Sequence, residues 1–180
     1  MYTLVKGSMV LDKETALKGL ESACRQMESA APVSDSRPRV ILSGATCEFP
    51  EFTDLIEDCG GHITGDDFCT GLRWHDFQTP TDIPPLQALA RRYLNRMICP
   101  AKHQGLNSRA DQLVQMAQKT GAGGVIFLLA KFCDPHAFDY PSIKSALEKE
   151  GIKTLSIETD GPHQGDGQVS TRIETFIQTL

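Results

Sequence analysis

A thiol, a carboxylate and an imidazole stand close together in the stretch KFCDPHAFDYP, residues 131–141. Cys133 and His136 are of the residue types that bind zinc or iron. Asp134-Pro135 would hold the thiol in a defined turn rather than in a mobile loop. A Cys-x2-His pair supplies two ligands at most, so a metal site here needs partners from elsewhere in the chain. The alternative for Cys133 taken alone is a buried thiol at the end of a core strand.

The other cysteines are scattered, and no two of the six are closer than ten residues. This spacing excludes the local CxxC pattern of zinc ribbons and ferredoxins, so a shared site must be assembled by the fold. Cys24 and Cys59 fall on apolar helical faces, where cysteine serves as a small hydrophobic core residue. Cys99 follows a helix, which favours a structural role. The chain shows no HExxH, P-loop, GxGxxG or Ser nucleophile elbow.

The elements that must position Cys133 alternate between short apolar strands and amphipathic helices. We predict strands at residues 40–42, 62–64, 125–129 and 154–157, and helices at 10–28, 52–59, 85–97, 109–120, 141–150 and 168–180. This alternation predicts an α/β fold: a three-layer, flavodoxin-like or Rossmann-like parallel sheet of about four strands with an N-terminal helical extension. The segment 125–129 is apolar on both faces and is expected in the sheet interior.

The proline-bearing stretch AAPVSDSRP, residues 30–38, is typical of a linker. We therefore predict two parts, an N-terminal helix and linker over residues 1–37 and an α/β domain over residues 38–180.

In a parallel sheet the carboxyl ends of all strands lie along one edge, where ligands bind. Cys47 follows the first predicted strand, Cys69 in GDDFCTG follows the second and Cys133 follows the third. Three thiols distant in sequence could therefore face one crevice. The helix starting near Pro141 would direct its positive end toward Cys133 and favour a thiolate. The alternative for GDDFCTG is a solvated loop with paired acids and turn glycines.

The composition limits the partners and the cellular compartment that can be expected for this protein. The net charge of −5 gives no electrostatic reason to expect nucleic acid or an anionic membrane as a partner. No apolar run approaches the ~20 residues of a membrane helix, and the N-terminus lacks the apolar stretch of a signal peptide. We therefore expect a cytoplasmic protein with reduced thiols.

Residues 123–160, GGVIFLLAKFCDPHAFDYPSIKSALEKEGIKTLSIETD, and GQVSTRIETFIQTL at 167–180 resemble a known family. They are similar to the C-terminal part of the 2-hydroxyacyl-CoA dehydratase and benzoyl-CoA reductase subunits, the 2-hydroxyglutaryl-CoA dehydratase D-component. The shared features are the V-I-F strand, K-F-C-D-P-H, the Y-P helix start, L-x-x-x-G-I and G-Q-x-x-T-R. GDDFCTG and ALARRYL at 88–94 also resemble the family. The resemblance covers residues 38–180 and is most specific at 131–141.

The resemblance implies a function. Such subunits bind a [4Fe-4S] or related cluster in a cleft between two flavodoxin-like domains, and they form heterodimers with a heterologous subunit. A separate ATP-hydrolysing activator delivers one low-potential electron, which drives radical dehydration of a 2-hydroxyacyl-CoA thioester or reduction of an aromatic acyl-CoA. The cysteine of K-F-C-D-P is a cluster ligand, which carries over to Cys133. Cys69 and Cys47 are further candidates for cofactor contact.

The chain also departs from the family pattern. Family subunits are about twice as long, and their N-terminal domain supplies further cluster cysteines, whereas no such domain precedes Met1 here. We expect a truncated form, a split-gene product or a degenerate homologue. GQVSTR keeps Arg172 but has Ser170 where the family often has a basic residue. The isolated chain is therefore expected to fold, to hold no stable cluster and to be inactive alone.

Two other functions are kept open. The chain could be a non-enzymatic assembly or scaffold module that retains the fold. It could also be a small zinc-binding α/β domain that uses Cys133, His136 and one or two strand-end thiols.

Overall fold

The computed structural model describes residues 2–31, 35–45, 50–102, 108–159 and 167–180. The chain divides into two compact units, Met1–Ser36 and Arg37–Leu180. The boundary lies inside the proline-bearing stretch at residues 30–38.

The first unit consists of two helices, α1 (Tyr2–Val10) and α2 (Lys13–Ser29). The side chain of Asp12 caps α2 by accepting a hydrogen bond of 2.9 Å from the Thr15 backbone N–H. The expected single helix at 10–28 is thus α2, and α1 was not predicted. Among its described residues α2 buries only Ala16, and Cys24 is exposed. The expectation that Cys24 is a core residue is therefore wrong, because the apolar stripe of α2 faces solvent.

The second unit is built on a four-stranded, all-parallel sheet. The strands are β1 (Arg39–Gly44), β2 (His62–Asp67), β3 (Gly124–Ala130) and β4 (Lys153–Thr159), in the order β2-β1-β3-β4. The predicted α/β class and parallel sheet are confirmed. β3 pairs with both β1 and β4, with Leu42 opposite Ile126 and Ile126 opposite Leu155, so its predicted interior position is also confirmed.

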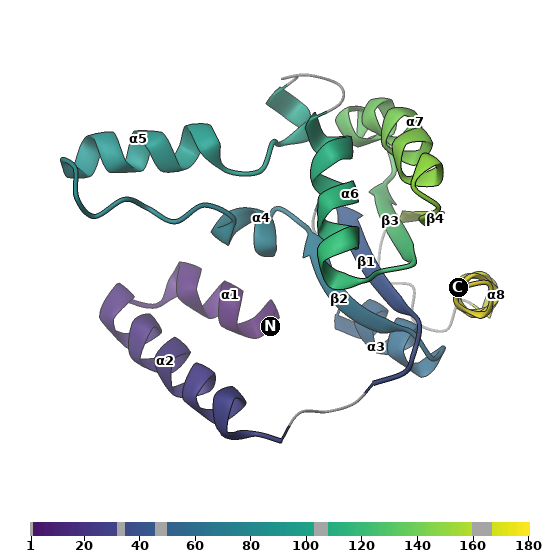
Figure 1. Ribbon diagram of the computed structural model, residues 1–180, viewed down its shortest axis with the longest axis horizontal. Helices are drawn as coiled ribbons and strands as arrows, with labels where there is room; N and C mark the ends of the chain where they lie inside the picture. The colour runs from purple at the N-terminus through teal and green to yellow at the C-terminus, as the bar shows by residue number, and fades with distance from the viewer. Residues whose placement is uncertain (1, 32–34, 46–49, 103–107, 160–166) are drawn as a thin grey trace. The chain divides into compact units, whose positions relative to one another are not determined.

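Helices cover both faces of this sheet (Figure 1). α3 (Pro50–Asp58) and α8 (Gly167–Gln178) pack on one face, and α6 (Ser108–Thr120) and α7 (Asp134–Lys149) pack on the other. β3 serves both layers, because Ile126 and Leu128 belong to the first core cluster and Val125 and Phe127 to the second. A strand buried on both faces explains why the run GVIFLLA is apolar without alternation.

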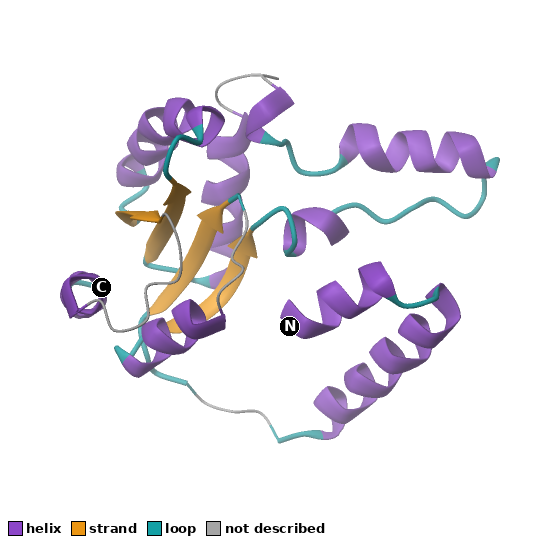
Figure 2. Cartoon of the chain, turned by 180° about the vertical axis from the view of Figure 1, so that it is seen from behind, coloured by secondary structure: helices purple, strands orange, loops and turns teal. Residues whose placement is uncertain are grey.

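Three shorter or less packed elements follow β2. They are α4 (Leu72–His75), α5 (Pro85–Asn95) and a single 3-10 turn at Pro100–Lys102. α5 stands away from the strands in Figure 2 and buries only Ala88 among its residues. Leu86 and Leu94 of α5 are 82% and 78% exposed.

Two predicted boundaries are wrong at the positions that matter most. α7 begins at Asp134 rather than near Pro141, because Asp-Pro suits the first helical turn, whose N–H groups lack an intrahelical acceptor. Pro141 lies inside the continuous helix. β2 runs to Asp67, so the first acids of GDDFCTG belong to the strand and not to a loop.

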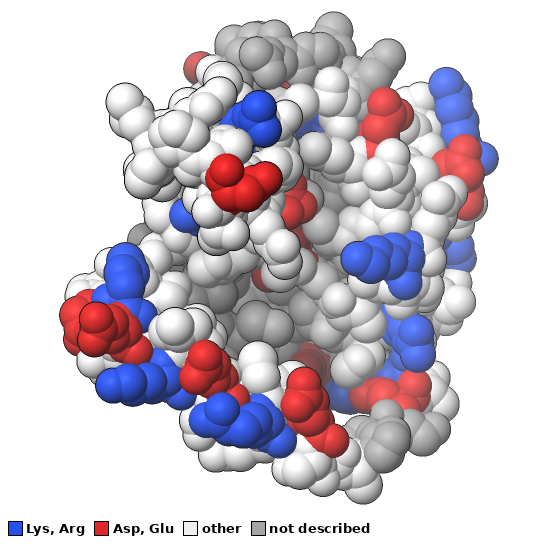
Figure 3. Space-filling model, turned by 60° about the vertical axis from the view of Figure 1, so that its left-hand side comes forward, with Lys and Arg blue, Asp and Glu red and all other residues white. Residues whose placement is uncertain are grey.

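Positive and negative side chains are interspersed on the face shown in Figure 3, with no large area of one sign. Within the described part of the chain, no helix has both the length and the apolar character needed to cross a membrane.

Candidate functional site

Cys133 is the N-cap residue of α7 and follows the end of β3 by three residues. Its backbone N–H donates to the Ala130 carbonyl at 3.1 Å, and its own carbonyl accepts from the Ala137 N–H at 3.1 Å. The side chain makes no capping hydrogen bond and is half-buried. The fold thus fixes the position of the thiol without using its sulfur.

The residue before Cys133 has an unusual backbone conformation. Phe132 has a φ of 63°, in the left-handed region that disfavours a side chain, and its ring is 97% exposed. This conformation turns the chain sharply from β3 into α7, and residues that keep such strain cluster at functional sites.

Cys69 follows β2 by two residues and is half-buried. Its backbone N–H donates to the Ala45 carbonyl at 2.9 Å, and its sulfur accepts a hydrogen bond of 3.1 Å from Nη1 of Arg73. Because β2 and β3 run parallel in one sheet, Cys69 and Cys133 lie at the same, carboxyl edge. This part of the geometric prediction is confirmed. Cys47 lies outside the described residues.

The strand order places a topological switch point between β1 and β3. The chain leaves β1 toward β2 on one side and leaves β3 toward β4 on the other. Connections that diverge in this way open a crevice at the carboxyl ends of the two strands, which is where open α/β sheets bind ligands. Cys133 follows one of these two strands.

A buried ion network lies beneath this edge, centred on Asp67 at the end of β2. The carboxylate of Asp67 is 1% exposed and accepts four hydrogen bonds. Arg73 donates through Nε at 2.9 Å and Nη2 at 2.6 Å, Arg109 through Nη2 at 2.7 Å, and Ser43 through Oγ at 2.9 Å. Buried charges require such pairing to be tolerated.

The network continues from α6 into α7. Nη1 of Arg109 donates to Asp139 at 2.9 Å, so one guanidinium joins the end of β2 to the helix that begins at Cys133. Arg73 joins the same carboxylate to the sulfur of Cys69. The ion network therefore connects the two segments that carry the edge thiols.

His136 is buried beside this network. Burial is the largest cause that lowers its pKa to about 4, and the positive charges of Arg109 and Arg73 lower it further. His136 is thus neutral near pH 7. It is 6% exposed, so it belongs to the packed interior of α7 rather than to the open edge.

The first acid of GDDFCTG holds the turn that carries Cys69. The carboxylate of Asp66 accepts from the N–H groups of Phe68 at 3.1 Å and Leu72 at 2.9 Å, while burial raises its pKa. A Cβ on Gly71 would lie 1.9 Å from Asp66 Oδ1, so the glycine is needed for this close approach. The alternative of a solvated loop for this stretch is wrong, because Asp67 is fully buried and the half-buried Asp66 accepts two backbone hydrogen bonds.

Sequence reasoning missed two cations of the site, Arg73 and Arg109, and the acid Asp139 that pairs with Arg109. A charged residue on a helix normally indicates a solvated face. The one available signal was the pair Asp66-Asp67 directly after an apolar strand, which required buried positive partners. Cys59 behaves as expected, since it packs partly buried against the core of β1, α3 and α8.

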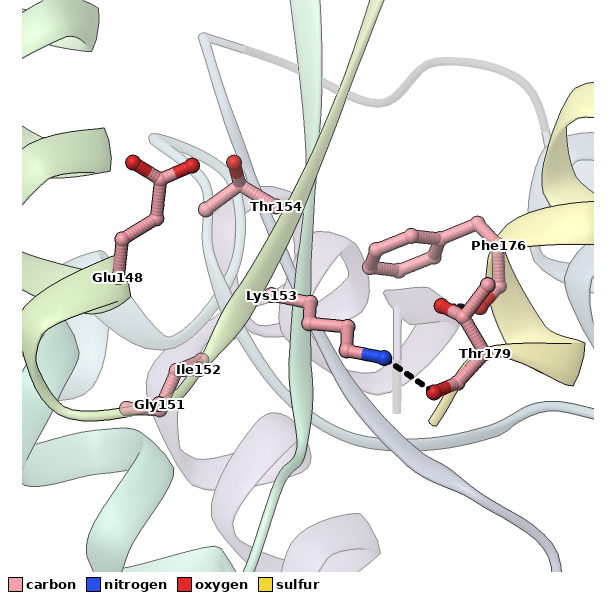
Figure 4. A pocket seen from close by; sticks show the side chains of 7 residues that line it. All are labelled: Glu148, Gly151, Ile152, Lys153, Thr154, Phe176 and Thr179. Atoms are coloured by element: carbon pink, nitrogen blue, oxygen red, sulfur yellow. Dashed lines mark hydrogen bonds between the residues drawn. The ribbon is translucent and has the colours of Figure 1, made fainter.

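A pocket of about 460 Å³ lies elsewhere, at the amino-terminal end of β4 (Figure 4). Gly151 and Lys153 line it from β4 and the turn before it, and Phe176 and Thr179 line it from the end of α8. The amine of Lys153 donates to the Thr179 carbonyl across its wall. This pocket is at the end of the strand opposite to the two thiols.

The described residues do not hold a complete metal site. They contain no group of three or more His, Cys, Asp or Glu side chains placed to hold a metal ion. A [4Fe-4S] cluster takes about four cysteine ligands. Among the described residues, Cys133 and Cys69 are thiols at one edge of the sheet, and they do not make up a complete set of such ligands.

Comparison with known proteins finds three relatives that are each named as the beta subunit of an acyl-CoA dehydratase. The chain is 29% identical to the (R)-phenyllactyl-CoA dehydratase beta subunit of Clostridium sporogenes, over 98% of this chain and 47% of the relative. It is 25% identical to the beta subunit of (R)-2-hydroxyglutaryl-CoA dehydratase of Acidaminococcus fermentans, over 99% of this chain and 48% of the relative. It is 25% identical to the lactoyl-CoA dehydratase subunit beta of Anaerotignum propionicum, over 96% and 46%.

The chain thus spans about half the length of the curated relatives it matches. The family model of the 2-hydroxyglutaryl-CoA dehydratase D-component matches residues 1–180, so the match extends beyond the expected 38–180 to include α1 and α2. The sheet is parallel, and a thiol is the N-cap residue of α7. Because the family model matches the whole length of the chain, the chain belongs to the 2-hydroxyglutaryl-CoA dehydratase D-component family.

Proposed function

We propose that this chain is the cluster-facing half of a 2-hydroxyacyl-CoA dehydratase or benzoyl-CoA reductase type of subunit, and that it acts on an acyl-CoA thioester within a larger assembly. The relatives it matches are beta subunits of acyl-CoA dehydratases, which supports both the substrate class and the need for other subunits. In this proposal a separate ATP-dependent activator supplies the electron and a heterologous subunit completes the enzyme.

The observation that carries the proposal is the position of Cys133. Its thiol sits at the N-cap of α7, at the carboxyl end of β3 and beside the switch point, and it makes no capping bond. The N-terminus of a helix favours negative charge through its unpaired N–H groups and its dipole. A half-buried sulfur in this place suits a thiolate ligand of a cluster bound outside the sheet edge.

The rest of the ligand set would come from beyond the described residues. Cys47 and cysteines of the complementary half-subunit are the proposed sources. Cys69 is the second candidate within the described chain, and its bond from Arg73 is of the kind that orients a sulfur ligand from outside the first coordination sphere. When bound, the cluster would supply one-electron chemistry. This chain would hold the sulfur of Cys133 in place through the ion network from Asp67 to Asp139.

Anaerobic reconstitution with iron and sulfide tests this proposal. The chain is loaded alone and after co-expression with the complementary half-subunit, and iron and acid-labile sulfide are measured after desalting. We expect little cluster in the chain alone, and about four irons per subunit in the complete assembly. Cys133→Ala should abolish that gain, while Cys24→Ala, which removes an exposed thiol on α2, should leave it unchanged.

Two results would contradict the proposal. One is an assembly in which Cys133→Ala retains a full cluster, since Cys133 would then not be a ligand. The other is a chain that alone holds a full cluster through desalting, because all ligands would then lie among its six cysteines. Zinc without sulfide would favour a zinc-binding domain instead, and no contact of His136 among the described residues favours that alternative at present.

A further inference from the structure

Two arginines and two aromatic rings form a cluster between α4 and α5. The guanidinium carbon of Arg92 lies 5.5 Å from the ring centre of Trp74 and 6.0 Å from that of Tyr93. The guanidinium carbon of Arg96 lies 5.8 Å and 4.9 Å from the same two centres. Both cations therefore share both rings, which brings two like charges into one small site.

These two charges have no carboxylate partner among the described residues. The guanidinium of Arg92 donates from Nη2 to the Trp74 carbonyl at 2.7 Å, and the guanidinium of Arg96 lies against the two rings with no hydrogen bond to a described residue. Residues 85–96 contain a third arginine, Arg91, and no acid, in a chain whose net charge is −5. Ring faces offset part of the repulsion between the guanidinium groups, and an anion would offset the rest.

One carboxylate lies close to this place: Asp76 accepts a hydrogen bond of 2.7 Å from the Met97 backbone N–H and forms no ion pair with either arginine among the described residues. Burial, followed by the charge of Arg92, lowers the pKa of His75, so the imidazole adds no charge near pH 7. Tyr93 is 44% exposed, and Leu89 beside it on α5 is 47% exposed, so apolar and aromatic surface stays accessible next to the guanidinium groups. The site thus combines paired cations with stacking surface.

We propose that Trp74, Arg92, Tyr93 and Arg96 bind the nucleotide end of the coenzyme A thioester, with the guanidinium groups on its phosphates and the adenine against the aromatic surface. This inference rests on the proposed function for the choice of an acyl-CoA. Guanidinium groups bind phosphate through paired hydrogen bonds, and aromatic rings stack on bases of any kind.

The position of the cluster fits this use. Trp74 follows Arg73 directly on α4, and Arg73 holds the sulfur of Cys69 at the carboxyl edge. The nucleotide would therefore bind on the same short helix that supports the edge, and the thioester would extend from there toward the crevice. Arg92 and Arg96 are half-buried and form no ion pair with a described residue, so phosphate binding would give their charges a partner.

The test uses the fluorescence of Trp74, the chain's one tryptophan. The full 180-residue chain is titrated with coenzyme A, and saturable quenching is expected. Pantetheine, which lacks the phosphates and the base, should neither quench nor compete. Arg96→Gln and Arg92→Gln should each weaken binding by about tenfold or more, because each removes charge-assisted hydrogen bonds.

Arg91→Gln is the matched control, since it removes the same charge from the same helix without touching either ring. It should change the affinity by less than about twofold. An equal loss in all three variants would show general attraction of an anion and overturn the site. Pyrophosphate that binds as tightly as coenzyme A would remove the stacking part of the proposal, and absence of quenching would refute it entirely. Circular dichroism of each variant verifies the fold.

The two proposals can fail separately. The iron and sulfide content of the assembly depends on Cys133 and not on the arginine cluster. If Cys133→Ala keeps the cluster while coenzyme A binds through Arg96, the ligand assignment fails and the nucleotide site stands. If coenzyme A does not bind while Cys133 is required for the cluster, this inference fails alone.

Discussion

At the scale of single residues, Asp67 is a fully buried carboxylate that pairs with two buried arginines. Its buried carboxylate compensates two guanidinium groups that are each 4% exposed. Removing one member of such a group leaves buried charge without compensation, which costs far more than the pair itself contributes.

We therefore expect Asp67→Asn to lower the free energy of unfolding by about 3 kcal/mol or more. Urea denaturation measures this change. Asp82→Asn is the control, because Asp82 is exposed and its loss should cost less than about 0.5 kcal/mol. A loss below about 1 kcal/mol for Asp67→Asn would mean that water compensates the arginines.

His136 makes stability depend on pH. Its pKa is about 4 in the folded chain and about 6.5 when unfolded, so the unfolded chain binds the proton more readily. The stability that comes from keeping His136 neutral is therefore present above pH 6.5 and is lost as the pH falls from there toward 4. Between pH 7.5 and pH 5 this loss should be about 1–2 kcal/mol.

His136→Gln tests that dependence, because glutamine does not titrate. Urea denaturation gives the free energy of unfolding at both pH values. Between pH 7.5 and pH 5 this free energy should fall less for the variant than for the unchanged chain, and the difference should be about 1–2 kcal/mol. Equal falls in the two proteins would show that His136 is not the titrating group.

At the scale of elements, α7 begins on a residue that is a poor helix cap. Serine at Cys133 could accept the N–H of the first turn, which the thiol does not do. We expect Cys133→Ser to raise the free energy of unfolding by about 0.5–1 kcal/mol. Cys24→Ser, in the exposed middle of α2, should have little effect. A clear loss of stability for Cys133→Ser would show that the packing of the sulfur outweighs the cap.

The elements themselves could be predicted where their apolar pattern was strong. The segment at 125–129 is apolar throughout and became the interior strand β3, and the pattern at 168–180 became α8. The start of α7 could not be predicted, because Asp134-Pro135 suits both a turn and the first turn of a helix. α1 was missed because its apolar residues do not form a clear stripe.

The site could be predicted only as far as the topology determines it. Parallel strands place Cys69 and Cys133 at one edge whatever their side chains do. The pairing of Asp67 with Arg73 and Arg109 depends on where α4 and α6 pack, and no pattern within one element encodes that. The arginine cluster on α5 was missed for the same reason, since its second ring comes from α4.

At the scale of the whole molecule, large apolar side chains remain exposed in both units. Leu86 and Leu94 of α5 are 82% and 78% exposed, and Met27 of α2 is 69% exposed. Exposed apolar surface of this kind promotes association. We expect the chain to self-associate as its concentration rises.

Sedimentation velocity can locate the responsible surface. Leu86→Gln together with Leu94→Gln should shift the chain toward monomer, while Met27→Gln should not. The reverse outcome would place the associating surface on the helical unit, and association that persists in both variants would exclude these residues altogether.

The sheet order has a further consequence for how the chain acquires its structure during synthesis. β1 pairs with β3, so Val40 cannot pair with Gly124 until the chain has been synthesised that far. At a synthesis rate of about 5–20 residues per second, β1 lacks its partner β3 for roughly 4–17 s. The helices of the first unit need only local contacts and form within microseconds. β1 carries Val40, Ile41 and Leu42, all buried in the finished sheet, so this interval is when the nascent chain is most exposed to aggregation and most dependent on chaperones.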